Sequence, residues 1–226
     1  MIPALDEAAC VGEVVDGVRA HVDTVVVVDN GSRDDTSAVA AAHGAVVEQE
    51  PRRGYGAACL RGLTRARVLG ASVVVFLDAD GSDDPGDVPR LLAALRDGAE
   101  LALGVRTRET TEAGAMTRTQ RFGNWLAPLL MQSIFGACYH DMPPLKAIRR
   151  DALDRLALTE TGHGFTIELL LRAHRAGLRV AEVPVRCRAR RAGASKVSGT
   201  VIGSARAAYR ILTTIARHAL RPRGHG

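Results

Sequence analysis

Several features that identify common protein classes are scarce in this chain of 226 residues. Aromatic residues make up only 4% of it, too few for the stacking surfaces with which many proteins hold single-stranded nucleic acid. The four cysteines follow neither metal-ligand spacing nor a disulfide framework, which suits a reducing cytoplasm. Neither a signal peptide nor an apolar run of bilayer length is evident, so we expect a protein that is soluble or peripheral to a membrane.

Size and charge narrow the remaining classes. Hydrophobic residues make up 46% of the chain, enough for one substantial α/β core or for one domain with an appendage. The net charge of +5 predicts a polyanionic partner, which could be nucleic acid, an anionic membrane or a phosphorylated substrate. Because no nucleic-acid recognition motif accompanies the charge, a basic nucleic-acid-binding module is the least favoured of these.

Short apolar, β-branched runs alternate with amphipathic stretches through the first half of the chain. The runs near residues 24–28, 45–47, 73–78 and 100–104 are typical of buried strands, and the stretches between them of helices. This alternation predicts a mostly parallel central sheet flanked by helices. Further along we expect a helix over residues 118–136 that is interrupted near Pro128, a helix over 164–176 and a strand over 179–186.

Two carboxylates, in the motif Asp78-Ala-Asp80, follow one of these predicted strands directly. Open α/β sheets bind ligands at the carboxyl ends of their strands. Alternate carboxylates at such a place can share a hard divalent cation with phosphate oxygens. An acidic, solvated turn would give the same pattern, so the motif alone leaves both interpretations open.

The last part of the chain is strongly basic. Residues 186–196 are typical of a basic loop, and residues 197–220 of an amphipathic, cationic helix. The sequence therefore predicts one domain over residues 1–196, followed by this helix and a basic tail over residues 197–226. The helix either rests on an anionic membrane or belongs to the core.

Six motifs follow one another along the chain. They are Pro3-Ala-Leu-Asp-Glu7, Val28-Asp-Asn-Gly-Ser32 with Thr36, Arg53-Gly-Tyr-Gly-Ala57, Asp78-Ala-Asp80, Gly104-Val-Arg106 and Arg190-Arg-Ala-Gly-Ala-Ser-Lys196. In this order they resemble the motifs of the family 2 glycosyltransferases with the GT-A fold. Within that family the chain is most similar to small bacterial polyprenyl-phosphate (dolichyl-phosphate) mannose or glucose synthases, and the resemblance covers nearly the whole chain.

This resemblance implies an α/β, Rossmann-like GT-A fold with a C-terminal amphipathic helix. It also implies a metal-dependent, inverting enzyme that moves a hexose from GDP-mannose or UDP-glucose, as examples of the donor type, to a polyprenyl phosphate. A soluble acceptor, such as a phosphorylated small acid or a natural-product intermediate, is the alternative. A catalytically silent relative that still binds nucleotide is a third possibility, and the intact Asp78 and Asp80 argue against it.

Carried over residue by residue, the resemblance places the donor and its metal. Asp78 would contact the ribose or the metal, and Asp80 would be the principal ligand of that metal, Mg²⁺ or Mn²⁺. The cation would neutralise the diphosphate leaving group. Some relatives have another ligand where this chain has Ser82, so Asp83 or water would complete the shell. The residues implied for the base, the ribose and the glycine loop are Pro3, Ala4, Glu7, Asp29, Arg53 and Gly54.

A set of basic and polar side chains is implied to handle phosphate, since guanidinium groups can bind phosphate oxygens bidentately. Two carboxylates, Asp141 and Glu168, are candidates for a general base, although Glu168 would fit the surface of a helix equally well. A phosphate acceptor is already ionised near neutral pH and needs no strong base. The phosphate-handling set is Arg106, Arg118, Arg121, Arg190, Ser195 and Lys196.

The chain departs from the pattern of these synthases in two ways. It has no C-terminal membrane spans, so contact with an anionic membrane would depend on the final helix and on the apolar segment around Trp125. Only Met1 and Ile2 precede Pro3, so we expect a shortened first strand or a start that lies upstream. The predicted location is the cytoplasm, at the inner face of the cell membrane, and a homodimer through the C-terminal helices is compatible with the sequence.

Overall fold

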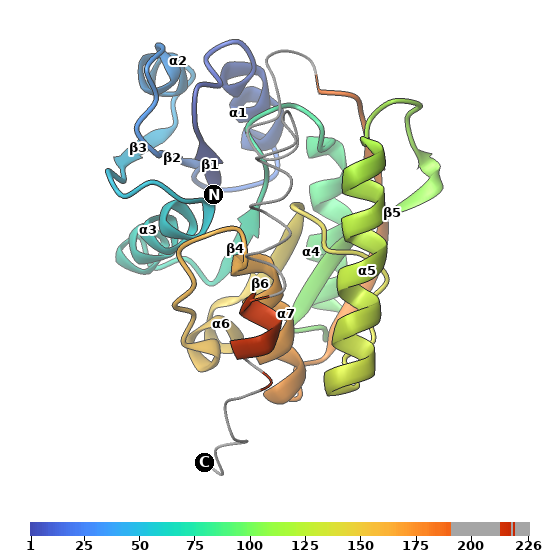
Figure 1. The fold of residues 1–226 in the computed structure, drawn as a ribbon. Coiled ribbons are helices and arrows are strands. Elements are labelled where there is room, and N and C mark those ends of the chain that lie inside the picture. The colour runs from blue at the N-terminus through green and yellow to red at the C-terminus, as the bar shows by residue number, and fades with distance from the viewer. Residues whose placement is uncertain (191–212, 218, 220–226) are drawn as a thin grey trace.

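The computed structural model describes residues 1–190, 213–217 and 219 (Figure 1). Ser195, Lys196 and most of the predicted C-terminal helix therefore lie outside the described residues. The elements in chain order are β1 (Ile2–Ala4), α1 (Val11–Arg19), β2 (Val26–Asp29), α2 (Thr36–Ala42), β3 (Val46–Gln49), α3 (Tyr55–Val68), β4 (Val73–Phe76), the 3₁₀ turn η1 (Pro85–Asp87), α4 (Val88–Arg96), β5 (Leu101–Thr111), α5 (Arg118–Phe135), β6 (Lys146–Arg149), α6 (Arg150–Leu156), α7 (Phe165–Arg175) and β7 (Val180–Cys187).

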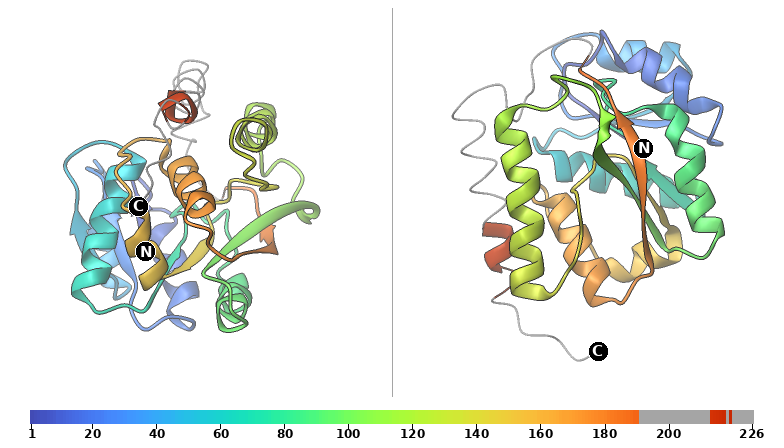
Figure 2. Two further views of the ribbon diagram at one scale, coloured as in Figure 1. Left: turned by 90° about the horizontal axis from the view of Figure 1, so that it is seen from below. Right: turned by 90° about the vertical axis from the view of Figure 1, so that its right-hand side faces the viewer.

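The strands form two groups that meet edge to edge. β1, β2 and β3 are parallel neighbours in that order, and the second group has the order β4-β6-β5-β7. The Met1 nitrogen donates to the Val75 carbonyl at 2.7 Å, and the Leu77 nitrogen donates to the Met1 carbonyl at 3.2 Å. These bonds place β1 beside β4, and helices cover both faces of the resulting layer (Figures 1 and 2). The predicted mostly parallel sheet is confirmed.

The strand β4 shows why this layer is covered on both faces. Its successive side chains point to opposite sides, as the pleat of a strand requires. Val74 and Phe76 belong to the cluster packed under α3, α6 and α7, whereas Val75 and Leu77 belong to the cluster under α1 and α4. The continuous apolar run that predicted a buried strand therefore serves two cores, and the chain leaves the sheet at Asp78.

Two parts of the second half differ from the sequence-based expectation. β6 is antiparallel to both β4 and β5, and neither it nor α6 was predicted. α5 continues through Pro128 without the predicted interruption. Proline removes one hydrogen bond of a helix, but Ala127 and Met131 on either side of it are fully buried, and this packing keeps the helix continuous.

The short C-terminal piece that the structure describes packs onto the domain. Thr214 and Ile215 are buried, and Ile215 belongs to the cluster that contains α7. A Cβ atom on Gly164, beside the first turn of α7, would lie only 2.2 Å from the Thr214 hydroxyl oxygen. Thr214 and Ile215 therefore belong to the core, whereas Ala216 and Arg217 are exposed. Among the described residues, no helix is both long enough and apolar enough to cross a bilayer.

Candidate active site

A cavity of about 540 Å³ opens at the carboxyl ends of β1 and β4. Its volume is in the range of sites that hold cofactors and small ligands. Its position is the one expected for an open α/β sheet. Among the sequence-predicted residues, those that line it are Pro3, Ala4, Glu7, Arg53, Gly54, Asp78, Asp80 and Arg190. The lining residues that the sequence did not predict include Asn30, Tyr55, Gln120, Thr161, Gly162 and His163.

The acidic turn after β4 forms one wall of this cavity. The Asp78 nitrogen donates to the Asp83 carboxylate at 3.2 Å, and the Ser82 nitrogen donates to Asp80 Oδ1 at 2.9 Å. Burial, reinforced by the charges of Asp83 and Asp80, raises the pKa of Asp78 well above its ordinary value. Burial likewise raises the pKa of Asp83. This turn concentrates negative charge that a bound cation would offset.

The carboxylates fit a hard divalent cation that takes its other ligands from a substrate. Among the described residues, no group of three or more His, Cys, Asp or Glu side chains is placed to hold a metal ion alone. Mg²⁺ is commonly held by one or two carboxylates together with substrate phosphates and water. Asp78 and Asp80 at the wall of an open cavity meet that description, and the residues present therefore fit the group.

Arg190 enters the cavity from the segment that follows β7. Its Nη1 donates to Glu7 Oε1 at 2.8 Å, and its Nη2 lies 2.9 Å from Asp80 Oδ2. One guanidinium group thus joins the loop after β1 to the acidic turn after β4. Burial acts to lower the pKa of Arg190, but the hydrogen bond to Glu7 and the charge of Asp80 raise it overall, so the side chain stays charged.

Asn30 connects the end of β2 to the glycine-bearing loop. Its side-chain nitrogen donates to the carbonyls of Glu50 and Arg52, and its Oδ1 accepts from the Gly54 nitrogen at 2.8 Å. The neighbouring Asp29 does not line the cavity, because its carboxylate accepts from the Ser37 hydroxyl and from the Ser32 nitrogen at 2.7 Å. Burial tends to raise the pKa of Asp29, but these hydrogen bonds lower it overall.

A loop around Thr161 also lines the cavity, although the sequence did not predict it as part of the site. The Ala57 nitrogen donates to the Thr161 carbonyl at 2.9 Å, and the Gly56 nitrogen donates to the Gly162 carbonyl at 3.1 Å. This backbone pairing brings the loop against the start of α3. A Cβ atom on Gly54 would lie only 2.2 Å from the Thr161 carbonyl oxygen, so the close approach requires glycine.

Glu168 holds the loop around Thr161 in place by hydrogen bonds to its backbone. Its buried carboxylate accepts from the backbone nitrogens of Thr159 and Glu160, at 2.8 and 2.7 Å, and pairs with Arg172 at 3.0 Å. Burial acts to raise the pKa of Glu168, and the hydrogen bonds from this loop lower it overall. Glu168 does not line the cavity, so its position favours an anchoring role over the predicted role as a base.

Replacement of Gly54 by Ala tests the packing of the two loops. Gly54 has φ of +148°, so the variant combines backbone strain with a clash against a carbonyl. We expect a loss of roughly 2–4 kcal/mol in the free energy of unfolding, measured by urea denaturation. Gly70→Ala is the control, since Gly70 also has positive φ but no atom near its added Cβ, and it should lose only about 1–2 kcal/mol. Equal losses in both variants would contradict the packing of the loops.

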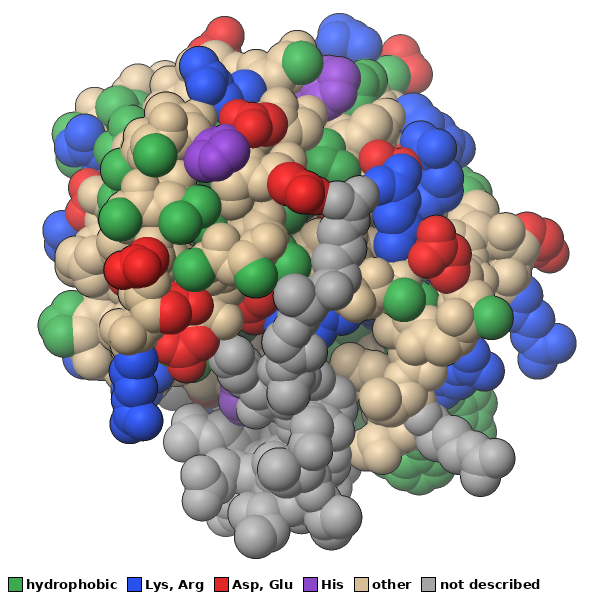
Figure 3. Space-filling model, turned by 90° about the horizontal axis from the view of Figure 1, so that it is seen from above, with side chains coloured by type: hydrophobic (Ala, Val, Ile, Leu, Met, Phe, Trp, Pro, Cys, Tyr) green, Lys and Arg blue, Asp and Glu red, His purple; other side chains and the backbone are tan. Residues whose placement is uncertain are grey.

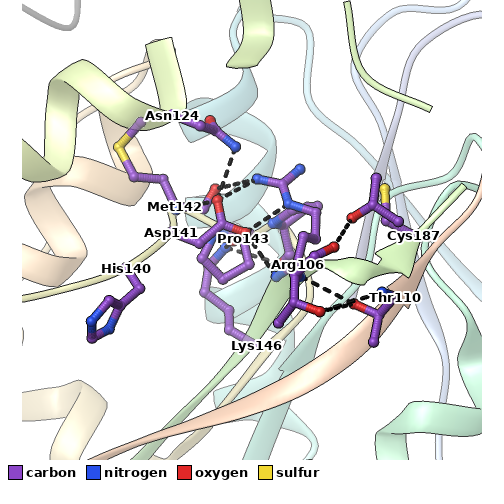
Figure 4. Close-up of polar contacts among 12 residues, drawn as sticks. Arg106, Thr110, Asn124, His140, Asp141, Met142, Pro143, Lys146 and Cys187 are labelled. Carbon is purple, nitrogen blue, oxygen red and sulfur yellow. Dashed lines mark hydrogen bonds and ion pairs between the residues drawn. The ribbon is translucent and has the colours of Figure 1, made fainter. Parts of the chain in front are cut away.

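Arg106 and Asp141 form a nearly buried, bidentate ion pair beside the cavity (Figure 4). The Arg106 Nε donates to Asp141 Oδ2 at 2.7 Å and its Nη2 to Oδ1 at 2.8 Å. Asn124 of α5 donates to the same carboxylate at 2.8 Å, as does the Met142 nitrogen at 2.7 Å. Figure 4 shows Arg106 and Asn124 reaching Asp141 from β5 and α5. In this structure the two side chains pair with each other, and their roles in phosphate binding and base catalysis stay predictions.

Lys146 is a buried charge that the sequence did not single out. Its Nζ donates to the carbonyls of Pro143 and Pro144 at 2.9 and 3.0 Å, and it lies 5.2 Å from the centre of the Phe76 ring. Burial lowers the pKa of Lys146, while nearby negative charges, including that of Asp78, act to raise it. Burial thus disfavours the charged form of the one lysine that lies close to Asp78 and Asp83 among the described residues.

Of the remaining predicted basic residues, Arg121 does not line the cavity and Lys196 lies outside the described residues. Arg118 is the first residue of α5, and Arg121 is exposed one turn later, next to the cavity-lining Gln120. Ser195 and Lys196 lie outside the described residues. In the view of Figure 3 the largest group of Lys and Arg side chains lies at the upper right, and other basic side chains are spread round the rim of this face.

The family follows from the comparison of this chain with known proteins. Residues 1–157 match the model of glycosyl transferase family 2. The chain belongs to this family. An uncharacterised glycosyltransferase of Mycobacterium tuberculosis is 39% identical to it over 205 residues, which cover 90% of this chain and 91% of the relative. An undecaprenyl-phosphate mannosyltransferase of Micrococcus luteus is 32% identical over 191 residues, which cover 80% of this chain and 78% of the relative.

A solved structure confirms the GT-A fold of this glycosyltransferase. Glucosyl-3-phosphoglycerate synthase from Mycobacterium tuberculosis, in complex with Mn²⁺ and UDP-glucose, matches it with a TM-score of 0.74 and 26% identity. The match covers 95% of this chain and 77% of that structure. The carboxylates after β4 and the loops after β1 and β2 all lie within residues 1–157, which match the family model.

Proposed function

We propose that this glycosyltransferase moves a hexose from a nucleotide diphosphate sugar to a polyprenyl phosphate at the cytoplasmic face of a membrane. In this proposal Asp78 and Asp80 hold Mg²⁺ or Mn²⁺, as the donor set of the cavity allows. The Mn²⁺ and UDP-glucose bound by the glucosyl-3-phosphoglycerate synthase support the metal and the donor class. The name of the Micrococcus relative supports the lipid acceptor.

The observation that carries the lipid acceptor is the exposed apolar face of α5. Phe122 and Trp125 are 58% and 61% exposed, and their rings are in contact at 5.9 Å. Leu129, which is 42% exposed, extends the same face by about one turn of the helix. Large apolar side chains gathered on one exposed face mark an interaction site. Because Gln120 in the first turn of the same helix lines the cavity, α5 begins beside the donor site.

The residues of the chain can perform an inverting transfer in one step. A phosphate oxygen of the acceptor attacks the anomeric carbon from the face opposite the diphosphate, and the bond from that carbon to the diphosphate oxygen breaks. When bound, the cation would neutralise the charge that develops on the leaving diphosphate. Arg190 adds a guanidinium that can bind phosphate oxygens bidentately. The acceptor oxygen carries no proton to remove, so the transfer needs neither Asp141 nor Glu168 as a base.

A second candidate acceptor is a soluble phosphorylated acid. The observation that favours it is the 26% identical structural neighbour, whose name gives 3-phosphoglycerate as the acceptor. Both acceptors present a phosphate group to the cavity. They differ in the apolar chain, which only the lipid would place on α5.

Measurement of nucleoside diphosphate release separates these acceptors. Purified protein with Mn²⁺ would be offered UDP-glucose or GDP-mannose, each with a short polyprenyl phosphate, with 3-phosphoglycerate or with no acceptor. We expect release from one donor to depend on the polyprenyl phosphate. Release stimulated only by 3-phosphoglycerate would overturn the lipid acceptor and keep the donor chemistry.

The double variant Phe122→Ser and Trp125→Ser tests the role of α5 in membrane contact. Burial of one large apolar side chain contributes roughly 1.5–3 kcal/mol, so we expect association with anionic liposomes to weaken by about tenfold or more, measured by co-sedimentation. Val68→Ser is the matched control, because Val68 is 71% exposed but lies at the end of α3. Equal weakening by both changes would mean that α5 is not the contact surface.

A further inference from the structure

The guanidinium of Arg190 forms an ion pair with Asp80, the carboxylate proposed above as a ligand of the metal. Both oxygens of Asp80 are engaged, since Oδ1 accepts from the Ser82 nitrogen at 2.9 Å and Oδ2 lies 2.9 Å from Arg190 Nη2. Each oxygen keeps a second lone pair that could ligate a cation, but a cation bound there would lie close to the positively charged guanidinium. The contact with Arg190 is the one that brings a second positive charge to the same oxygen, so repulsion makes it the one to yield.

We propose that Arg190 has two positions, and that its move from Asp80 to the donor diphosphate couples metal binding to donor binding. In the first position it joins Glu7 to Asp80 and competes with the cation. In the second it keeps Glu7 and gives its freed nitrogen to a diphosphate oxygen. The inference rests on the proposed function, because it takes Asp80 as a metal ligand.

The cavity contains all the parts of this exchange. Glu7, Asp80 and Arg190 line the same space, so the guanidinium needs no new partner beyond the diphosphate itself. The side chain of Arg190 is 23% exposed, which leaves it room to turn. Glu7 is only 8% exposed and retains one end of the guanidinium while the other end moves. Since coupling between two ligands is reciprocal, nucleotide should favour the metal as much as metal favours the nucleotide.

Substitution of Arg190 by Gln should change two affinities in opposite directions. Without nucleotide, the variant loses the competing charge, and we expect it to bind Mn²⁺ about tenfold more tightly, measured from the free-Mn²⁺ signal by electron paramagnetic resonance. With saturating Mn²⁺, it lacks the diphosphate contact. We then expect binding of UDP or GDP, whichever the wild type binds, to weaken by about tenfold in a calorimetric titration.

Arg188 supplies the matched control for this change in charge. It lies two residues earlier and pairs with Asp84 at 2.7 Å, outside the lining of the donor cavity. Arg188→Gln removes the same charge and should leave both affinities within about twofold of the wild type. An equal tightening of Mn²⁺ binding in both variants would reduce the effect to net charge and overturn the proposal.

Two further outcomes also decide the proposal. Mn²⁺ binding that is unchanged or weaker in Arg190→Gln would show that the guanidinium does not compete for Asp80. If the Gln variant does not fold, Arg190→Lys replaces it. This variant should shift both affinities in the same directions by smaller amounts. No shift in either affinity would overturn the proposal that Arg190 has two positions. Neither titration contains an acceptor, so failure of the lipid acceptor would leave the result on Arg190 intact.

Discussion

Replacement of Asp80 by Asn is expected to lower kcat by roughly 10²–10³-fold, the range found when one stabilising contact to a developing charge is removed. Asp80 lies at the cavity wall, within 2.9 Å of the Arg190 guanidinium. The amide oxygen of Asn can still accept from the Ser82 nitrogen, so the turn after β4 should keep its shape. Initial rates of nucleoside diphosphate release at saturating Mn²⁺ measure the loss.

The control for this substitution is Asp84→Asn in the same acidic segment. Asp84 accepts from the Gly86 nitrogen and pairs with Arg186 and Arg188, and it does not line the donor cavity. An Asn there keeps the capping bond, and we expect kcat within about threefold of the wild type because the lost ion pairs involve partly exposed arginines. A similar loss of kcat in both variants would mean that Asp80 acts through the stability of the turn.

Replacement of Asp141 by Ala is expected to cost about 3–5 kcal/mol in the free energy of unfolding, as when one partner of a buried ion pair is removed. The change leaves the Arg106 guanidinium without its carboxylate, although only 13% of that side chain is exposed. It also removes the acceptor for Asn124, and with it the link between β5 and α5. Urea denaturation followed by circular dichroism gives the loss directly.

Asp154→Ala is the comparison for this loss. Asp154 also forms ion pairs with arginine, in its case with both Arg67 and Arg150, but its side chain is 41% exposed. Exposed ion pairs contribute about 0–1 kcal/mol, so this variant should lose no more than that. A loss at Asp141 as small as the one at Asp154 would contradict a role for the Arg106–Asp141 pair in holding the site together.

The parts of the site that the sequence predicts are those with a local signal. Asp78 and Asp80 follow a buried strand, so their place at the sheet edge depends only on where the apolar run ends. For these two residues the strand pattern is enough to place the side chain. Pro3 and Ala4 had no such signal and were placed by the resemblance to family 2 glycosyltransferases, and the structure has them at the end of the short strand β1, where they line the cavity.

Residues that reach the site through long-range contacts have no such signal. The loop at Thr161 meets the start of α3 by backbone hydrogen bonds to residues about a hundred positions earlier, and main-chain bonding of this kind leaves no pattern in side-chain type. Asn30 lies inside a recognised motif, yet its contacts with Glu50, Arg52 and Gly54 depend on how three loops meet. These contacts become visible only in the folded chain.

The antiparallel strand β6 was missed because it opens with a charge. Lys146 is its first residue and is fully buried, although lysine in sequence argues for solvent. The Pro143 and Pro144 carbonyls and the Phe76 ring compensate the charge, and all three depend on tertiary structure. The hydrogen bonds of the two candidate bases were not visible in the sequence for a related reason, because the donors to Asp141 and Glu168 come from other segments of the chain.

The measurement that tests the central claim most directly is transfer of labelled hexose into an organic phase. Purified protein, Mn²⁺, undecaprenyl phosphate and radiolabelled GDP-mannose or UDP-glucose would be incubated and then extracted with butanol. The account predicts label from one donor in the butanol layer, lost when Mn²⁺ is chelated and in Asp80→Asn. Label that remains wholly in the aqueous phase with both donors, while the protein still binds nucleotide and Mn²⁺, would contradict transfer to a polyprenyl phosphate.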